Sequence, residues 1–155
     1  MKCGLVAMSL ALSLISSLFA PAFADASGVV VEQPWARASI GIKRPGAAFF
    51  LVRNTGDETV VLVGVETDLA WLPQVHETTT NANGVSSMRK IDRLEIGPGE
   101  AYFLEPGGAH LMLMKLRRPM IEGEQFQLTL RFENGDATST QVPILGVTSR
   151  GPNFD

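Results

Sequence analysis

The sequence predicts an all-β fold, a single antiparallel β-sandwich or β-barrel. Three observations support this prediction. Short apolar or alternating segments follow one another at regular intervals, clusters of Gly, Pro, Asn and Asp separate them, and no segment after residue 24 has convincing helical periodicity. Strands this short and this evenly spaced are typical of antiparallel sandwiches and barrels.

Each expected strand is bounded by turn residues. The clearest one covers residues 125–132, where Phe126, Leu128, Leu130 and Phe132 alternate with polar residues. Asn134-Gly135, a hairpin signal, follows it directly. In chain order, the expected strands are residues 28–32, 47–53, 58–66, 71–77, 87–91, 101–104, 109–116, 125–132 and 138–144.

The first 24 residues have the pattern of a secretory signal peptide. Lys2 gives a positive start, residues 5–19 are apolar or small without a charge, and Ala22-Phe23-Ala24 is an A-x-A cleavage site. The apolar stretch is shorter than the roughly 20 residues that a membrane-spanning helix needs. We therefore expect cleavage after Ala24, export, and no stable membrane insertion afterwards. Residues 25–155 would form one domain with a short, loose C-terminal tail.

Charge and cysteine content exclude several classes of function. Without the signal peptide the chain has 12 Lys and Arg against 16 Asp and Glu, a net charge of −4. This mild acidity gives no indication of nucleic acid as a partner. The single cysteine, Cys3, lies inside the signal peptide. A blue-copper electron-transfer site requires a Cys thiolate with two His, so that function is excluded.

Four residues outside the signal peptide could form a soft-metal site. His110 and Met112 are separated by one residue on an expected strand, so their side chains would point to the same face. His76 and Met88 lie at the two ends of one loop, and strand pairing could bring all four groups together. Thioethers favour Cu(I) over hard cations, whereas zinc sites use Cys, His and carboxylates. The residues therefore predict a Cu(I) site.

Other nearby residues are interpreted structurally. A methionine is more often a core filler than a ligand. Met114 shares the expected face of His110 and Met112, and we interpret it as packing rather than as a substitute ligand. Met120 follows Pro119 in a turn and should be structural, and Glu77 should be solvated because it would point away from His76. Trp35 and Trp71 are expected to be core or rim aromatics.

The four candidate ligands resemble the pattern H-x10-M-x21-H-x-M of the periplasmic copper chaperone family called PCu(A)C. Met88 and His110 are separated by the 21 residues of the pattern. His76 and Met88 are separated by 11 residues, one more than the pattern has, and the extra residue is assigned to the turn at 81–84. The segments 34–38 (PWARA) and 54–57 (NTGD) also resemble the family, so the resemblance covers nearly all of residues 25–155.

This resemblance implies a cupredoxin-like, Greek-key β-barrel with a partly exposed Cu(I) site, in a periplasmic protein. It also implies delivery of copper toward the dinuclear copper centre of cytochrome c oxidase, to an oxidase subunit or a Sco-type protein. Delivery would proceed by ligand exchange, because an acceptor with Cys thiolates binds Cu(I) more strongly. Affinity should weaken as the pH falls below about 6.5, since imidazole binds metal only when neutral.

Alternative functions remain open at this point. One is general periplasmic copper storage or resistance, and another is a metal-free β-sandwich used for adhesion or assembly. An enzyme is not expected, because no Ser-His-Asp or Cys-His constellation is apparent. A copper oxygenase that uses its own N-terminal His is also not expected, because the predicted mature N-terminus is Asp25.

Overall fold

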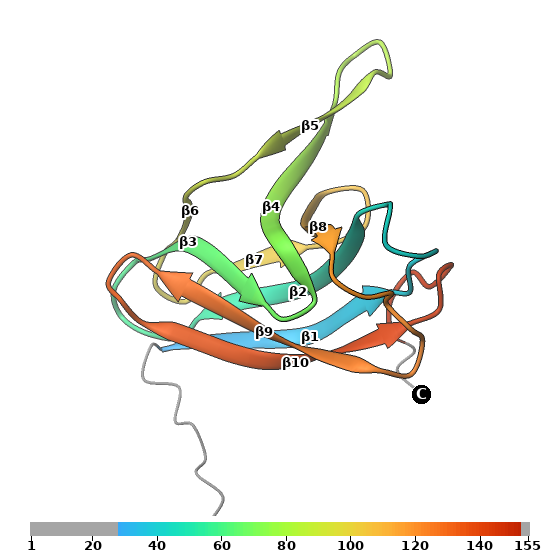
Figure 1. Ribbon diagram of the computed structural model, residues 1–155. Coiled ribbons are helices and arrows are strands. Elements are labelled where there is room, and N and C mark those ends of the chain that lie inside the picture. Colours follow the sequence, from blue (N-terminus) through green and yellow to red (C-terminus); the bar gives the residue numbers. More distant parts are fainter. Residues whose placement is uncertain (1–27, 153–155) are drawn as a thin grey trace, which may run out of the picture.

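Ten β-strands and no helix make up residues 28–152, the part of the chain that the computed structural model describes (Figure 1). The strands are β1 (Val29–Arg37), β2 (Gly46–Asn54), β3 (Val60–Thr67), β4 (Ala70–Thr80), β5 (Ser86–Lys90), β6 (Leu94–Ile96), β7 (Ala101–Leu104), β8 (Ala109–Leu116), β9 (Gln125–Phe132) and β10 (Ala137–Leu145). The all-β prediction is confirmed, and all nine expected strands are present. The expected signal peptide lies outside the described residues. Within them, no helix could cross a membrane.

The strands form one mixed sheet in the order β5-β4-β8-β2-β1-β10-β9-β3-β6, and β7 also pairs with β2. Every ladder is antiparallel except the one between β1 and β10, where Ala36 and Arg37 pair in parallel with Ile144 and Leu145. The sheet does not close into a barrel, because β5 and β6 lie at its two edges and do not pair with each other. Of the two expected arrangements, the open sandwich therefore describes the fold better than a closed barrel.

Every strand except the edge strand β5 contributes to a single apolar core. Phe126, Leu128, Leu130 and Phe132 of β9 are each at most 3% exposed, as their alternation predicts. Met120 is also buried in this core, which confirms its structural role. The other members of the cluster are Leu69, in the turn before β4, and residues of β1, β2, β3, β4, β6, β7, β8 and β10.

The position of β8 determines where the candidate ligands lie. It is hydrogen-bonded between β4 and β2, and Leu111 and Leu113 are fully buried on its core face. Because neighbouring side chains of a strand point to opposite faces, His110, Met112 and Met114 lie on its outer face. Figure 1 shows β4, the neighbour of β8 in the sheet, and β5 standing out from the other strands.

Candidate copper site

His76 and His110 lie opposite each other on the neighbouring strands β4 and β8. They are direct partners in the antiparallel ladder between β4 and β8. Their ring centroids are 6.3 Å apart, with an angle of 36° between the ring planes. Val75 on β4 and Leu111 on β8 are buried in the core, which fixes the register, because a slip of one residue would turn both apolar side chains toward solvent. The two imidazoles are thus held on the same outer face by the core beneath them.

The two methionines lie on opposite sides of His76. Met112 is paired with Gln74, two residues before His76, and Met88 is paired with Thr78, two residues after it. Both methionines are therefore diagonal cross-strand neighbours of His76. Such neighbours are about 7–8 Å apart, which long side chains can span. The ladders place all four predicted ligands on one face, with His76 at the centre.

Burial decreases from β8 toward the edge of the sheet. His110 is only 8% exposed, His76 and Met112 are half-buried, and Met88 is 57% exposed. Every residue of β5 is exposed, and β5 pairs only with β4. The site therefore has a fixed, buried side at His110 and an accessible side at Met88.

Hydrogen bonds orient both rings. Nδ1 of His110 donates to the carbonyl oxygen of Gly108 at 3.1 Å, which leaves the lone pair of Nε2 free. Nε2 of His76 donates to Oε1 of Gln74 at 3.2 Å, which leaves the lone pair of Nδ1 free. A metal-binding imidazole commonly donates its other ring N–H to such a partner, which fixes its tautomer and orientation. Each ring thus offers one nitrogen for a metal ion.

The surroundings of His76 favour its neutral form. Burial lowers its pKa below the usual value, and the nearby His110 and the positive charge of Lys90 lower it further. Lys90 is the cross-strand partner of His76 on β5 and forms an ion pair with Asp92. Because only neutral imidazole binds metal, this lowered pKa extends metal binding by His76 to lower pH.

Oxygen ligands do not provide an alternative site. Within residues 28–152, no group of three or more His, Cys, Asp and Glu side chains could hold a metal ion. Glu77 follows His76 in sequence but forms an ion pair with Arg89, with 2.6 Å between Oε2 and Nη2. The thioethers of Met88 and Met112 are the soft donors on this face, and such donors favour Cu(I).

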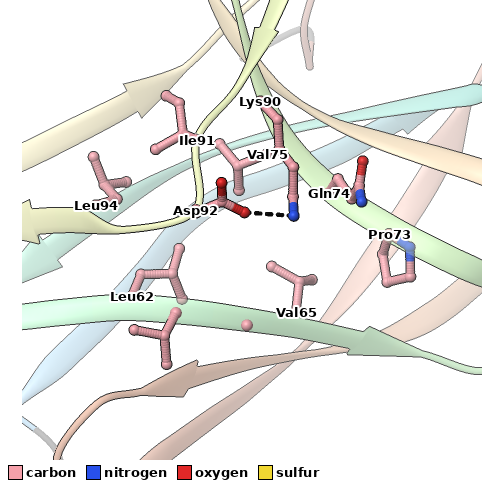
Figure 2. A pocket seen from close by; sticks show the side chains of 11 residues that line it. Leu62, Val65, Pro73, Gln74, Val75, Lys90, Ile91, Asp92 and Leu94 are labelled. Atoms are coloured by element: carbon pink, nitrogen blue, oxygen red, sulfur yellow. Dashed lines mark ion pairs between the residues drawn. The ribbon is translucent and has the colours of Figure 1, made fainter.

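A cavity of about 190 Å³ lies beside the site, between β3, β4 and the segment that follows β5 (Figure 2). Gln74 and Lys90, which flank His76, form part of its lining, and the Lys90–Asp92 ion pair is drawn there in Figure 2. The lining contains neither His nor Met. The cavity therefore adjoins the four candidate ligands but does not contain them.

Sequence reasoning missed Gln74 and Lys90. Both could have been found from strand alternation: Gln74 lies two residues before His76, and Lys90 two residues after Met88, so each shares a face with a proposed ligand.

Comparisons with known proteins agree with the expected family and fold. Residues 29–144 match the family model described as putative lipoprotein LpqE-like. A putative lipoprotein of Leifsonia xyli subsp. xyli (strain CTCB07) is 36% identical over 132 residues, which cover 84% of this chain and 77% of that protein.

Among the solved structures that are similar to this chain, two differ in how closely their sequences match it. The Cu(I) form of DR1885 from Deinococcus radiodurans is 31% identical, with a TM-score of 0.58, over 79% of this chain and 83% of that one. The apo PCuAC domain of PmoF2 is 21% identical, with a TM-score of 0.66, over 81% of this chain and 95% of that domain. The second match shows the fold alone, and it confirms the expected cupredoxin-like class.

Proposed function

Because the chain belongs to the LpqE-like family and has the fold of PCuAC domains, we propose that it is an exported Cu(I) chaperone. The proposed ligands are His76, Met88, His110 and Met112. The observation that carries this proposal is the cross-strand pair of His76 and His110, with a methionine diagonal to His76 on each side. A relative of solved structure, DR1885, is described in a Cu(I) form.

Chemistry of the donors supports copper as the cargo. Two imidazoles and two thioethers are neutral and include soft sulfur, a combination that selects Cu(I) over the hard cations. No thiolate is available outside the expected signal peptide. A site of this kind holds Cu(I) less strongly than a site with Cys thiolates does, so transfer to such an acceptor would be downhill.

The accessibility of the site supports release by ligand exchange. Met88 is exposed on an edge strand, whereas His110 is buried on a central one. An acceptor could therefore replace Met88 first and share the ion with His76 and His110 before it takes over completely. No catalytic step is part of this function.

We propose that the receiving protein is either the oxidase subunit that holds the dinuclear copper centre of cytochrome c oxidase, or a Sco-type protein. In both cases the transfer would take place in the periplasm. General copper storage or resistance is the competing role. Deletion of the encoding sequence distinguishes them. Loss of the dinuclear copper signal of the oxidase, with unchanged copper tolerance, supports delivery; loss of tolerance with a normal oxidase supports storage.

The binding proposal is tested by anaerobic Cu(I) titration against a chromogenic chelator. The wild-type chain should hold one Cu(I), and the His110→Ala, Met112→Ala double variant should compete much less well. Met114→Leu is the matched control, because Met114 lies on the same strand and face. X-ray absorption of the loaded protein should show both nitrogen and sulfur neighbours. A wild type that competes no better than the double variant would instead support the metal-free interaction module.

A further inference from the structure

A second surface lies next to the proposed copper site, at the other end of the same strands. Leu72 pairs with Met114 one step beyond the Gln74–Met112 pair. On the other side of β8, Gly46 at the start of β2 pairs with Leu113. The loop at 39–45, the start of β4 and the end of β8 therefore converge about 7 Å along the strand from Met112, the rise of two residues.

Large apolar side chains are exposed at this end. Trp71 is 70% exposed, Ile40 is 77% exposed, and Ile42 and Leu72 are 49% and 37% exposed. The other tryptophan of the chain, Trp35, is by contrast only 5% exposed. Exposed apolar side chains that gather in one place mark interaction sites, and Trp is enriched among the residues that dominate binding energy.

Positive side chains that form no ion pair within the described residues also lie at this end. Six Lys and Arg residues of the described chain form ion pairs: Arg53, Arg89, Lys90, Arg93, Arg118 and Arg131. Six others within residues 28–152 form none, and four of these lie at this end: Lys43, Arg44, Lys115 and Arg117.

The local charge differs from that of the whole chain. Two carboxylates near this end of the strands, Asp68 and Glu124, form ion pairs, and both pair with Arg118. The guanidinium of Arg117 lies over the ring of Trp71, 4.3 Å from its centroid, and it remains exposed. The full sequence has a net charge of −3, so this positive surface is a local exception.

We propose that the surface formed by Trp71, Lys43, Arg44, Lys115 and Arg117, here called the basic rim, docks the protein that receives copper, and that the docking face of this protein is acidic. The proposal rests on the proposed function, because ligand exchange requires direct contact at the site. The acceptor enters at exposed Met88, which pairs with Thr78, and the rim begins near Leu72, six residues or about 20 Å back along β4. A protein with an interface of ordinary size that docks on the rim therefore also reaches Met88. Complementary charge speeds such encounters and selects the partner, while Trp71 supplies apolar contact area at low entropic cost.

The test uses three synthetic peptides with one Cys-x-x-Cys motif, flanked by Asp and Glu, by Gly and Ser, or by Lys and Arg. Stopped-flow mixing with the copper-loaded full chain gives the rate of Cu(I) transfer to each. At low salt the acidic peptide should accept copper at least about tenfold faster than the basic one. The difference should fall steeply in salt of about 0.5 M, where exposed charges are screened.

Charge-reversal variants locate the effect. Lys115→Glu should slow transfer to the acidic peptide, and Lys43→Glu, Arg44→Glu, Lys115→Glu together should reverse the preference. Arg150→Glu is the matched control, because Arg150 is also exposed and forms no ion pair within the described residues; this variant should transfer at the wild-type rate. Equal rates with the three peptides, or an equal loss in Arg150→Glu and Lys115→Glu, would overturn the proposal.

A second arm does not depend on copper. Acidic and basic peptides with Ser-x-x-Ser in place of the motif are titrated into the metal-free chain, with Trp71 fluorescence as the readout. Binding of the acidic peptide alone supports the basic rim even if the chain holds no Cu(I), a result that would sink only the proposed function. Binding to phosphatidylglycerol vesicles, with no response to the acidic peptide, would overturn a protein partner in favour of a membrane.

Discussion

Acidification should weaken the binding of Cu(I) to this protein, and the structure sets an upper limit on the loss of affinity. Copper competes with protons for an imidazole ligand, because an imidazole must be neutral to bind metal. For a ring with a pKa of about 6.5, the change from about pH 7.5 to about pH 5.5 lowers the neutral fraction about tenfold, or about 1.4 kcal/mol. A site with two such unperturbed rings, taken as the reference, would lose about 100-fold.

His76 makes the expected loss smaller. Burial, His110 and Lys90 lower its pKa, so this ring stays neutral further into the acid range. We therefore expect the Cu(I) affinity to fall by less than 100-fold over this interval. Competition against a chromogenic Cu(I) chelator, corrected for protonation of the chelator, measures the loss under anaerobic conditions.

A charge variant makes this prediction sharper. Lys90→Gln removes one of the charges that lower the pKa of His76, so its affinity should fall more steeply with acid than that of the wild type. Arg89→Gln is the control, because Arg89 is paired with Glu77, which points to the other side of β4. A loss of 100-fold or more in the wild type, or an affinity that is constant from pH 5 to 8, would refute the reasoning.

Other predictions concern both the site and the fold. The free energy of unfolding of the metal-free chain should decrease as the pH falls from about 6.5 toward the lowered pKa of His76, since the unfolded state then binds more protons; urea titrations at several pH values measure this. Gly46→Ala should cost about 1–3 kcal/mol, because its new methyl group would collide with the sulfur of buried Met120. Asn54→Ala should cost about 2–3 kcal/mol or more, since the buried side chain donates to the carbonyls of Glu58 and Ile96 and accepts from the N–H of Gly56. Thermal unfolding measures both losses, and a change below about 0.5 kcal/mol in either variant would contradict the packing described here.

Local patterns were sufficient to predict most of the strands. The alternation in β9 and the turn at Asn134-Gly135 specify a hairpin with β10, and the observed ladder pairs these two strands. Strand β6 was missed because Leu94–Ile96 is too short to show an alternating pattern. The parallel pairing of β1 with β10 could not be predicted either. It joins the first and last strands, which are far apart in the sequence, so no local pattern of residues indicates it.

The candidate site was predictable in composition but not in geometry. Strand alternation alone placed His110 and Met112 on one face, and the structure agrees. Which residue of β4 lies opposite His110 depends on the pairing of distant segments, so the central position of His76 emerged only from the ladders. The same limit applies to the tryptophans: Trp35 is in the interior and Trp71 on the surface, a difference that their local sequence does not reveal.

The order of the strands also suggests an order of events during copper release. β8 is held by hydrogen bonds on both sides, whereas β5 is held only by β4 and is exposed along its whole length. Segments with few buried contacts move at the lowest free-energy cost, so Met88 should leave the ion before His110 does. Met88→Leu should therefore change the rate of transfer to a thiolate acceptor by a larger factor than it changes the affinity. His110→Ala should instead remove most of the affinity. Equal effects of Met88→Leu on rate and affinity, measured by stopped flow and by chelator competition, would show that the edge strand has no special part in release.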